Sequence, residues 1–317
     1  MNALPFGQAE PLASAHQPLV SIIIATRDRT ESLVRCLDSL LAMEYPAFEV
    51  IVVDNAPSSD ETERRLKTYP TGLFRYVREE QPGLAVAHNR GVEEARGSLL
   101  AFTDDDVEVD PRWLDELLAG FAAAEAVGCV TGRILPAELE TDAQLWLEEY
   151  GGFSKGDSLR VFDMDRHRPG DRLFPYAAGT FGSGANMPFT REALERIGGF
   201  DPALGAGSKG VGGDDLAAFF RVITSGYALV YQPAAVVHHW HRRDYQGLRK
   251  MAHGYGVGLT AYLTSILLQE PRRVPEILAA LPAAAAHVLN PSSPKNHRKS
   301  ASFPRQLTWD ERMGMLR

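Results

Sequence analysis

Residues 19–29 have the sequence LVSIIIATRDR, a run of branched apolar residues that stops abruptly in polar ones. Such a run is typical of a strand buried on both faces of a parallel sheet. In residues 29–43, which follow, leucines recur at helical spacing: Leu33, Leu37, Leu40 and Leu41. A buried strand followed by an amphipathic helix predicts the first unit of an α/β fold.

The same alternation repeats along the first half of the chain. Residues 48–62 (FEVIVVDNAPSSDET) and 98–109 (SLLAFTDDDVEV) predict two more buried strands, and residues 73–80 (LFRYVREE) predict a shorter one. Helices are expected over residues 83–97 and 110–124. This order predicts an open, mostly parallel sheet that is flanked by helices and joined by right-handed crossovers.

Acidic residues gather where such a sheet binds its ligands. Asp28, Asp54 and the aspartate triplet Asp104–Asp106 lie at or just past the carboxyl ends of three expected strands. Adjacent carboxylates repel one another, so folding alone gives no reason to place three of them together. The cluster therefore predicts a site for a cation or a cation-bound ligand. The alternative is a strand end capped by solvated acids.

The composition excludes several classes of function. The 317 residues include 41 acidic and 33 basic ones, a net charge of −8, which argues against broad nucleic-acid binding and suits a pocket that attracts a metal. Cys36 and Cys129 lie far apart in apolar surroundings, so they predict neither a metal motif nor a disulfide framework. Residues 1–17 lack the basic and apolar regions of a signal peptide and are expected to form a flexible leader of a cytoplasmic protein.

Beyond the leader, we expect one domain over residues 18–245, in two halves (18–130 and 131–245). Residues 246–290 are expected to form a helical segment, and residues 291–317 a flexible basic tail. Residues 251–269 contain no acid, lysine or arginine but carry three glycines, which favours a packing or interfacial helix over a membrane span. Peripheral contact with the inner face of a membrane is expected through this segment.

Seven motifs in order carry a family likeness: SIIIATRDR, VIVVDNAPSSDET, QPGLAVAHNRGVEEARG, LLAFTDDDV, IGGFDP, GGDDLAAFFR and HHWHRR. Together they resemble the family 2 glycosyltransferases over about residues 20–243. The resemblance implies a GT-A fold and the transfer of a sugar from a nucleotide-sugar with inversion. It makes residues 18–245 the catalytic domain, with residues 18–130 as the nucleotide-binding half and residues 131–245 as the acceptor half. It also implies a hydroxyl acceptor, such as a glycan or a glycolipid, and a donor that is most often a UDP-sugar, with GDP and dTDP as alternatives.

By this resemblance the aspartate triplet is the DxD motif of the family. Asp106 would ligate a divalent cation, Mn²⁺ or Mg²⁺, that bridges the two phosphates of the donor. Asp104 would contact the ribose or a metal-bound water. Asp105 would also belong to the residues that bind the nucleotide-sugar, but it is the most dispensable of the three aspartates. Strand alternation places His239 and His241 on one side of the chain, and one of them would complete the metal shell.

The resemblance also assigns the rest of the donor pocket. Thr26, Asp28 and Asp54 would hold the base and ribose, because an acid can accept a hydrogen bond from the N–H of the base. N-capping is the alternative role for Asp54. The family commonly has an Arg-Asn pair in the next helix, whereas this chain has His-Asn-Arg, so either Asn89 or Arg90 would contact phosphate. Asn186 would bond to the donor sugar.

In GGDDLAAFFR, Asp215 aligns with the carboxylate that takes the proton of the acceptor hydroxyl. Asp214 replaces a glutamate of the acceptor site, and Arg221 would orient that site. The further acid of the family falls at Ala217 and is missing. The alternative is that both aspartates are helix-start acids favoured by the helix dipole.

Rival functions fit the sequence less well. A dinucleotide-binding oxidoreductase or a nucleotidyltransferase would need glycines after the first strand, and ATRDRT has none. A non-catalytic nucleotide-sugar-binding or scaffold subunit remains the alternative. The aspartate triplet and the Asp214–Asp215 pair speak against it.

Overall fold

The computed structural model describes residues 17–293 and 295–317. The expected leader, except for its last residue at position 17, therefore lies outside the described residues. The strands are β1 (Val20–Thr26), β2 (Phe48–Asn55), β3 (Phe74–Glu79), β4 (Leu99–Asp104), β5 (Val107–Val109), β6 (Val127–Pro136), β7 (Arg160–Phe162), β8 (Asn186–Thr190) and β9 (Ala228–His239). The helices are α1 (Thr30–Leu41), α2 (Glu61–Leu66), α3 (Leu84–Glu94), α4 (Trp113–Phe121), α5 (Asp142–Tyr150), α6 (Arg191–Arg196), α7 (Asp214–Thr224), α8 (Tyr245–Gln269), α9 (Val274–Leu289) and α10 (Arg305–Gly314). Two short 3-10 turns are η1 (Ala178–Thr180) and η2 (Pro271–Arg273).

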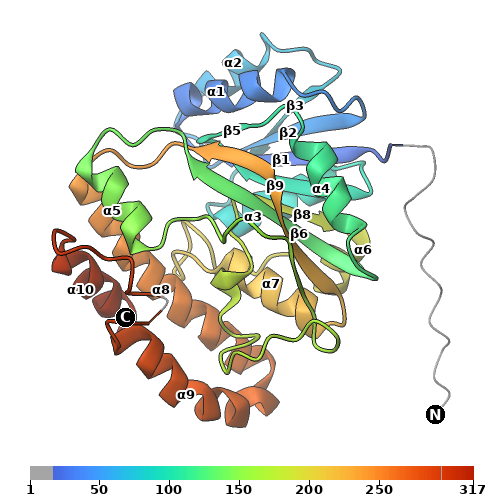
Figure 1. Cartoon of the computed structure of the whole chain (residues 1–317). Coiled ribbons are helices and arrows are strands. Elements are labelled where there is room, and N and C mark those ends of the chain that lie inside the picture. The colour runs from blue at the N-terminus through green and yellow to red at the C-terminus, as the bar shows by residue number, and fades with distance from the viewer. Residues whose placement is uncertain (1–16, 294) are drawn as a thin grey trace, which may run out of the picture.

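In the described residues these strands form one nine-stranded sheet, in the order β3-β2-β1-β4-β8-β6-β9-β5, with β7 paired to β9 (Figure 1). The neighbours β3, β2, β1 and β4 run parallel, which confirms the predicted α/β fold. Beyond β4 the sheet is mixed. Strand β8 is antiparallel to β4 and β6, β9 is parallel to β6, and β5 is antiparallel to β9. The strict strand–helix alternation that predicts parallel strands extends only as far as β4.

The apolar strands are buried on both faces, which explains their unbroken runs. Ile22 and Ile24 of β1 face one side, where the apolar residues of α1 and α4 cover them. Ile23 faces the opposite side, together with Phe102 and residues of α3, α6 and α7. All four of these side chains are fully buried. The helices thus cover both faces, and the carboxyl edge of the parallel strands is left for a site.

The middle of the chain contains a helix and strands that the sequence analysis did not name. Residues 131–175 contain the end of β6, all of α5 and strand β7. Helix α5 begins with a capping box, in which Thr141 Oγ1 accepts a hydrogen bond from Gln144 N and Gln144 Oε1 accepts one from Thr141 N. The T-x-x-Q spacing at this point is a helix-start signal that could have predicted α5.

Three helices, α8, α9 and α10, extend the sheet-containing part of the chain on one side (Figure 1). Helix α8 packs on α7, and α10 lies along α8. The expected flexible tail is therefore wrong for residues 305–314, which form α10 with Leu307 fully buried and Phe303 beside it. A Cβ at Gly256 would collide with the backbone oxygen of Glu311, so this glycine lets the two helices approach closely.

No helix among the described residues combines the length and the apolar character needed to cross a membrane.

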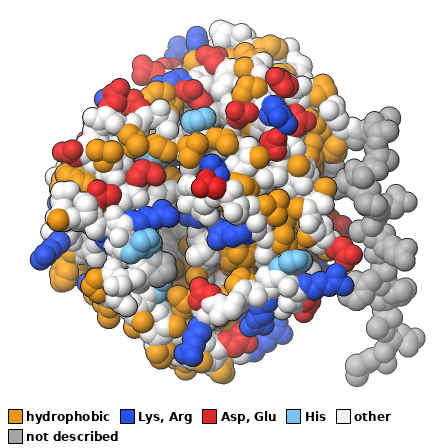
Figure 2. Space-filling model, in the orientation of Figure 1, with side chains coloured by type: hydrophobic (Ala, Val, Ile, Leu, Met, Phe, Trp, Pro, Cys, Tyr) orange, Lys and Arg blue, Asp and Glu red, His pale blue; other side chains and the backbone are white. Residues whose placement is uncertain are grey.

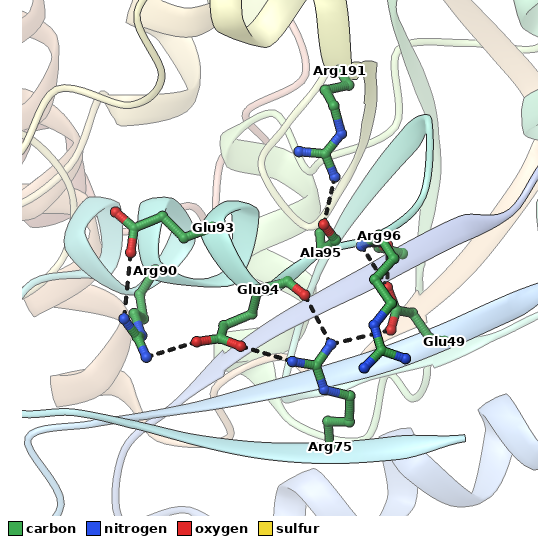
Figure 3. A network of polar contacts seen from close by, with 9 residues as sticks. Glu49, Arg75, Arg90, Glu93, Glu94, Ala95, Arg96 and Arg191 are labelled. Atoms are coloured by element: carbon green, nitrogen blue, oxygen red, sulfur yellow. Dashed lines mark hydrogen bonds and ion pairs between the residues drawn. The ribbon is translucent and has the colours of Figure 1, made fainter. Parts of the chain in front are cut away.

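A buried carboxylate ties the strands together near their amino-terminal ends (Figure 3). Glu49 of β2 accepts hydrogen bonds from Ser21 Oγ (2.7 Å) and Arg96 N (2.7 Å), and pairs with Arg75 (3.3 Å). Arg75 in turn pairs with Glu94 at the end of α3 (2.7 Å). Burial by itself raises the pKa of Glu49, but these donors outweigh it, and the pKa is lowered.

We predict that Glu49→Gln lowers the free energy of unfolding at pH 7 by about 1.5 to 3 kcal/mol, because the buried donors lose a charged acceptor. The lowered pKa favours the folded state above the ordinary glutamate pKa, and this advantage is lost as the pH falls through the folded value. Urea unfolding of both proteins at pH 7 and near pH 4 should therefore give a smaller difference at the lower pH. Glu93→Gln, whose side chain is 68% exposed, is the matched control. An equal effect of both substitutions would contradict the role given to Glu49.

Candidate active site

A cavity of about 1390 Å³ lies at the carboxyl ends of β1 and β4. The aspartate triplet and His239 line one part of its wall, and Asp214 and Asp215 another. Helices α8 and α9 line the far side, together with the two glycine-rich stretches at residues 182–184 and 206–213. Figure 2 shows one face of the molecule, where Lys, Arg and His side chains gather around a hollow.

Three side chains at this edge form a set that fits a divalent cation. Asp104, Asp106 and His239 each offer one ligand atom, and these atoms lie within 4.8 Å of one another. Asp106 Oδ1 is buried without a hydrogen-bond partner and lies 3.4 Å from His239 Nε2. Burial lowers the pKa of His239 to about 4, so its imidazole is neutral at pH 7 and can act as a ligand. Two carboxylates and one imidazole suit Mn²⁺, and the oxygens suit Mg²⁺.

One arginine compensates the charge of the triplet. Arg29 Nη1 pairs with Asp105 (2.7 Å), and Arg29 Nη2 pairs with Asp106 (2.6 Å). Thr26 Oγ1 donates a hydrogen bond to the other oxygen of Asp105 (2.6 Å). Burial raises the pKa of Asp105 to about 6 although Arg29 opposes this rise. The sequence analysis missed Arg29. The available signal was its place in the TRDR stretch, residues 26–29, in which β1 ends.

This arrangement changes the expected role of two residues. Asp105 lines the cavity, but both of its carboxylate oxygens are engaged by Thr26 and Arg29, so in this arrangement it supports the triplet. Thr26 lines the cavity, but its hydroxyl donates its hydrogen bond to Asp105.

His241 lies behind His239 and outside the group that could hold a cation. Its Nδ1 lies 2.8 Å from His239 Nδ1, and its Nε2 lies 2.9 Å from Glu148 Oε1. Both ring nitrogens of His241 face protein partners, so among the described residues His239 is the histidine placed to join the aspartates.

Asp215 is the second residue of helix α7, and its carboxylate is held by backbone amides. Its Oδ2 accepts a hydrogen bond from Gly184 N (3.0 Å), and its Oδ1 accepts one from Leu216 N (2.8 Å). Burial raises the pKa of Asp215, which makes it a better proton acceptor than an exposed aspartate. Lys155, in the loop after α5, lines the same cavity, and burial lowers its pKa to about 8 although Asp215 opposes this shift. Sequence analysis missed Lys155, which no motif marks.

Asp214 is more deeply buried than Asp215. Burial and the neighbouring Asp215 raise its pKa to about 7. Its Oδ2 lies 3.7 Å from Nδ1 of His88, a buried histidine whose pKa burial lowers to about 3. His88 packs against Phe102 and Phe200 and lines the cavity. The two adjacent aspartates therefore differ, because one is anchored by amides and the other faces a neutral imidazole.

The ends of β1 and β2 carry the remaining acids of the expected donor pocket. Asp54 is fully buried, accepts a hydrogen bond from Tyr76 Oη (3.0 Å), and has a second oxygen without a hydrogen-bond partner. Burial raises the pKa of Asp54. Asp28 is exposed and accepts hydrogen bonds from the backbone and hydroxyl of Ser58. Asn55, next to Asp54, lines the cavity.

Residues 21–198 match the family model described as Glycosyl transferase family 2, which is more than half of the chain. The chain belongs to glycosyl transferase family 2.

Relatives differ in how much of the chain they match. Glycosyltransferase AglE of Haloferax volcanii is 34% identical over 102 residues, which cover 31% of this chain and 34% of AglE. This chain therefore aligns with only about a third of that relative's length. The glucosyl-dolichyl phosphate glucuronosyltransferase of the same organism is 23% identical over 226 residues, covering 69% of this chain and 68% of that protein.

A solved structure shows the same fold. The mannosyltransferase PcManGT from Pyrobaculum calidifontis, in complex with GDP-Man and Mn²⁺, superposes with a TM-score of 0.58 at 20% identity. The comparison covers 95% of this chain and 88% of the mannosyltransferase. The GT-A fold expected for a family 2 glycosyltransferase is therefore confirmed.

Two donor-site residues expected from the family resemblance lie outside the cavity of this family 2 chain. Both amide atoms of Asn89 bind the backbone of Phe200, at 2.8 and 2.9 Å. Arg90 pairs with Glu93 and Glu94 on its own helix. The contacts of Asn89 tie α3 to the loop after α6, whereas those of Arg90 stay on α3 itself. Neither side chain lines the cavity in which a donor phosphate would lie.

Asn186 and Arg221 also have structural partners. Asn186 is fully buried, accepts a hydrogen bond from Trp113 Nε1 (2.9 Å), and donates to two backbone oxygens, those of Arg133 and Ala235. Since this exhausts its donors, it stabilises the junction of β8, β6 and α4 and does not face a sugar. The guanidinium of Arg221 bonds to Gly199 O and to the side chains of Asp201 and Gln269, away from the cavity.

Proposed function

We propose that this protein transfers a sugar from a nucleotide-sugar to a hydroxyl acceptor, with inversion and with the help of a divalent cation. The observation that carries the proposal is the convergence of Asp104, Asp106 and His239 at the carboxyl edge of the sheet, in the same cavity as Asp215. In this role, Asp104, Asp106 and His239 would hold the cation. A bound Mn²⁺ or Mg²⁺ would neutralise charge that develops on the leaving diphosphate.

The chain's own residues would supply the other half of the reaction. Asp215 is the candidate general base, because its carboxylate is anchored by two backbone amides and its pKa is raised by burial. It would accept the proton of the acceptor hydroxyl while that oxygen attacks the sugar carbon opposite the departing diphosphate. Such a single displacement inverts the configuration at that carbon. Asp214 belongs to the same acceptor end of the cavity.

For the donor we propose UDP-sugars first. Buried Asp54, with one oxygen unpartnered, is suited to accept a hydrogen bond from the N–H of a base. The mannosyltransferase of similar fold holds GDP-Man, so GDP-sugars belong in the same panel, and dTDP-sugars remain a further candidate.

For the acceptor we propose a glycan or a glycolipid. The name of the Haloferax glucuronosyltransferase refers to a dolichyl phosphate sugar, which supports a lipid-linked acceptor. Helix α9 contributes apolar residues to the cavity, among them Ile277 and Leu281, and it contains no buried residue. A helix that is apolar on its outer side as well, with Leu278 58% and Leu289 61% exposed, fits contact with a lipid surface.

The first test concerns the cation. Asp106→Asn should weaken Mn²⁺ binding at least about tenfold, because the best-buried ligand oxygen loses its charge. The dissociation constant is measured by electron paramagnetic resonance of free Mn²⁺, with and without UDP. Asp60→Asn, an exposed acid at the start of α2, is the matched control and should leave the constant unchanged. An Asp106 variant that binds Mn²⁺ as tightly as the parent protein would overturn the metal assignment.

The second test concerns the base. Asp215→Asn should leave donor binding intact and lower kcat at least about a hundredfold, in line with the contribution of a positioned general base. Turnover is followed with a panel of nucleotide-sugars, and donor affinity by calorimetry. Normal turnover in this variant would remove Asp215 from the mechanism. Donor binding by the parent protein without transfer or hydrolysis of any donor would favour the non-catalytic subunit instead.

The third test concerns the lipid surface. The double variant Leu278→Glu, Leu289→Glu should reduce co-sedimentation with vesicles that contain anionic phospholipid at least about fivefold, because two charged groups would have to enter the apolar layer. Leu41→Glu, at a similarly exposed leucine of α1, is the control and should sediment like the parent protein. Equal sedimentation of all three proteins would dismiss α9 as the contact.

A further inference from the structure

Four side chains form a continuous polar row that begins at the proposed cation site and ends at Glu148 of α5. Asp106 Oδ1 lies 3.4 Å from His239 Nε2, His239 Nδ1 lies 2.8 Å from His241 Nδ1, and His241 Nε2 lies 2.9 Å from Glu148 Oε1. The row joins three parts of the chain that are far apart in sequence: the turn between β4 and β5, the end of β9 with the residues just after it, and helix α5. The proposed metal ligands do not include the two members farthest from the cation site, His241 and Glu148.

For a neutral His241, the hydrogen-bonding capacity of these groups sets the direction of the row. A carboxylate only accepts hydrogen bonds, so His241 must carry its proton on Nε2 to donate to Glu148. With a single proton on the ring, His241 Nδ1 is then an acceptor. The contact between the two Nδ1 atoms therefore requires His239 to carry its proton on Nδ1. This leaves the lone pair of His239 Nε2 directed toward Asp106, where a cation would be bound.

The surroundings hold the row in this geometry. The side chain of His241 is fully buried, so water does not compete for its nitrogens. Phe153 packs against both rings, with centroid distances of 5.0 Å to His239 and 5.7 Å to His241. A Cβ at Gly152, whose φ is +54°, would lie 2.8 Å from a Glu148 oxygen. The glycine at the end of α5 thus lets the chain turn tightly over the carboxylate.

We propose that Glu148, acting through His241, is a positioning residue that sets the tautomer of His239 and keeps its Nε2 lone pair available to the cation. Outer carboxylates that act on a ligating imidazole typically contribute 10- to 100-fold to metal affinity. Here a second imidazole is interposed between the carboxylate and the ligand. The inference rests on the proposed function, because it assumes that His239 is a ligand of the cation.

The tautomer is measured directly, without metal and without substrate. In the metal-free protein labelled with ¹⁵N-histidine, the nitrogen shifts distinguish a protonated Nδ1 from a protonated Nε2, and His239→Gln assigns the signal. We expect His239 to carry its proton on Nδ1 in the parent protein. In Glu148→Gln the carboxamide can donate as well as accept, so the Nε2-protonated form should become populated.

Metal affinity provides the second readout. Glu148→Gln should weaken Mn²⁺ binding about 10- to 100-fold. Glu149→Gln, the same change of charge on the next residue of α5, bonds to Ser300 instead and should leave both the tautomer and the affinity unchanged. His239 protonated on Nε2 in the metal-free parent protein would overturn the proposal, and so would a Glu148→Gln variant with unaltered tautomer and affinity. Failure of the proposed function looks different: Asp106→Asn would then bind Mn²⁺ normally while the tautomer of His239 still responded to Glu148.

Discussion

The site depends on the ion pairs that Arg29 makes with Asp105 and Asp106, at 2.7 and 2.6 Å. Three adjacent carboxylates at the end of a buried strand would otherwise repel one another and favour protonation. The planar guanidinium engages two of them at once, which a lysine could not do with the same geometry. Asp104 and one oxygen of Asp106 are left to face His239. The arginine thus makes the cluster compatible with folding. It leaves Asp104, one oxygen of Asp106 and His239 free to face a cation.

The mixed part of the sheet brings the second half of the site to this corner. Strand β5 follows the triplet directly and pairs antiparallel with β9, with Val107 opposite His239. This pairing places a residue from late in the chain beside the aspartates. The candidate base is supported differently, by backbone amides at the start of α7 and at Gly184. The proposed cation site and the proposed base are therefore held by separate parts of the backbone.

Several motif residues stabilise the walls of the site. Asn89 joins α3 to the loop that contains Phe200, and Asn186 joins β8 to β6 and Trp113. Polar residues near the ends of strands are equally suited to bind a ligand or to satisfy buried backbone groups. Motif order cannot distinguish these two uses, which is why both asparagines were expected to bind the donor. The distinction appears only when their hydrogen-bond partners are known.

The sequence by itself determined the α/β alternation of the first half, the acidic rim and the family, because these follow from local periodicity and from motifs in order. It did not determine which histidine faces the aspartates, the role of Arg29 or the packing of α10. Arg29 and Asp106 are 77 positions apart, and Glu148 and His241 are 93 apart. Such contacts depend on the register of β5 against β9 and on the place of α5 beside them. Only the tertiary structure decides those, because no local pattern encodes the distance between two remote side chains.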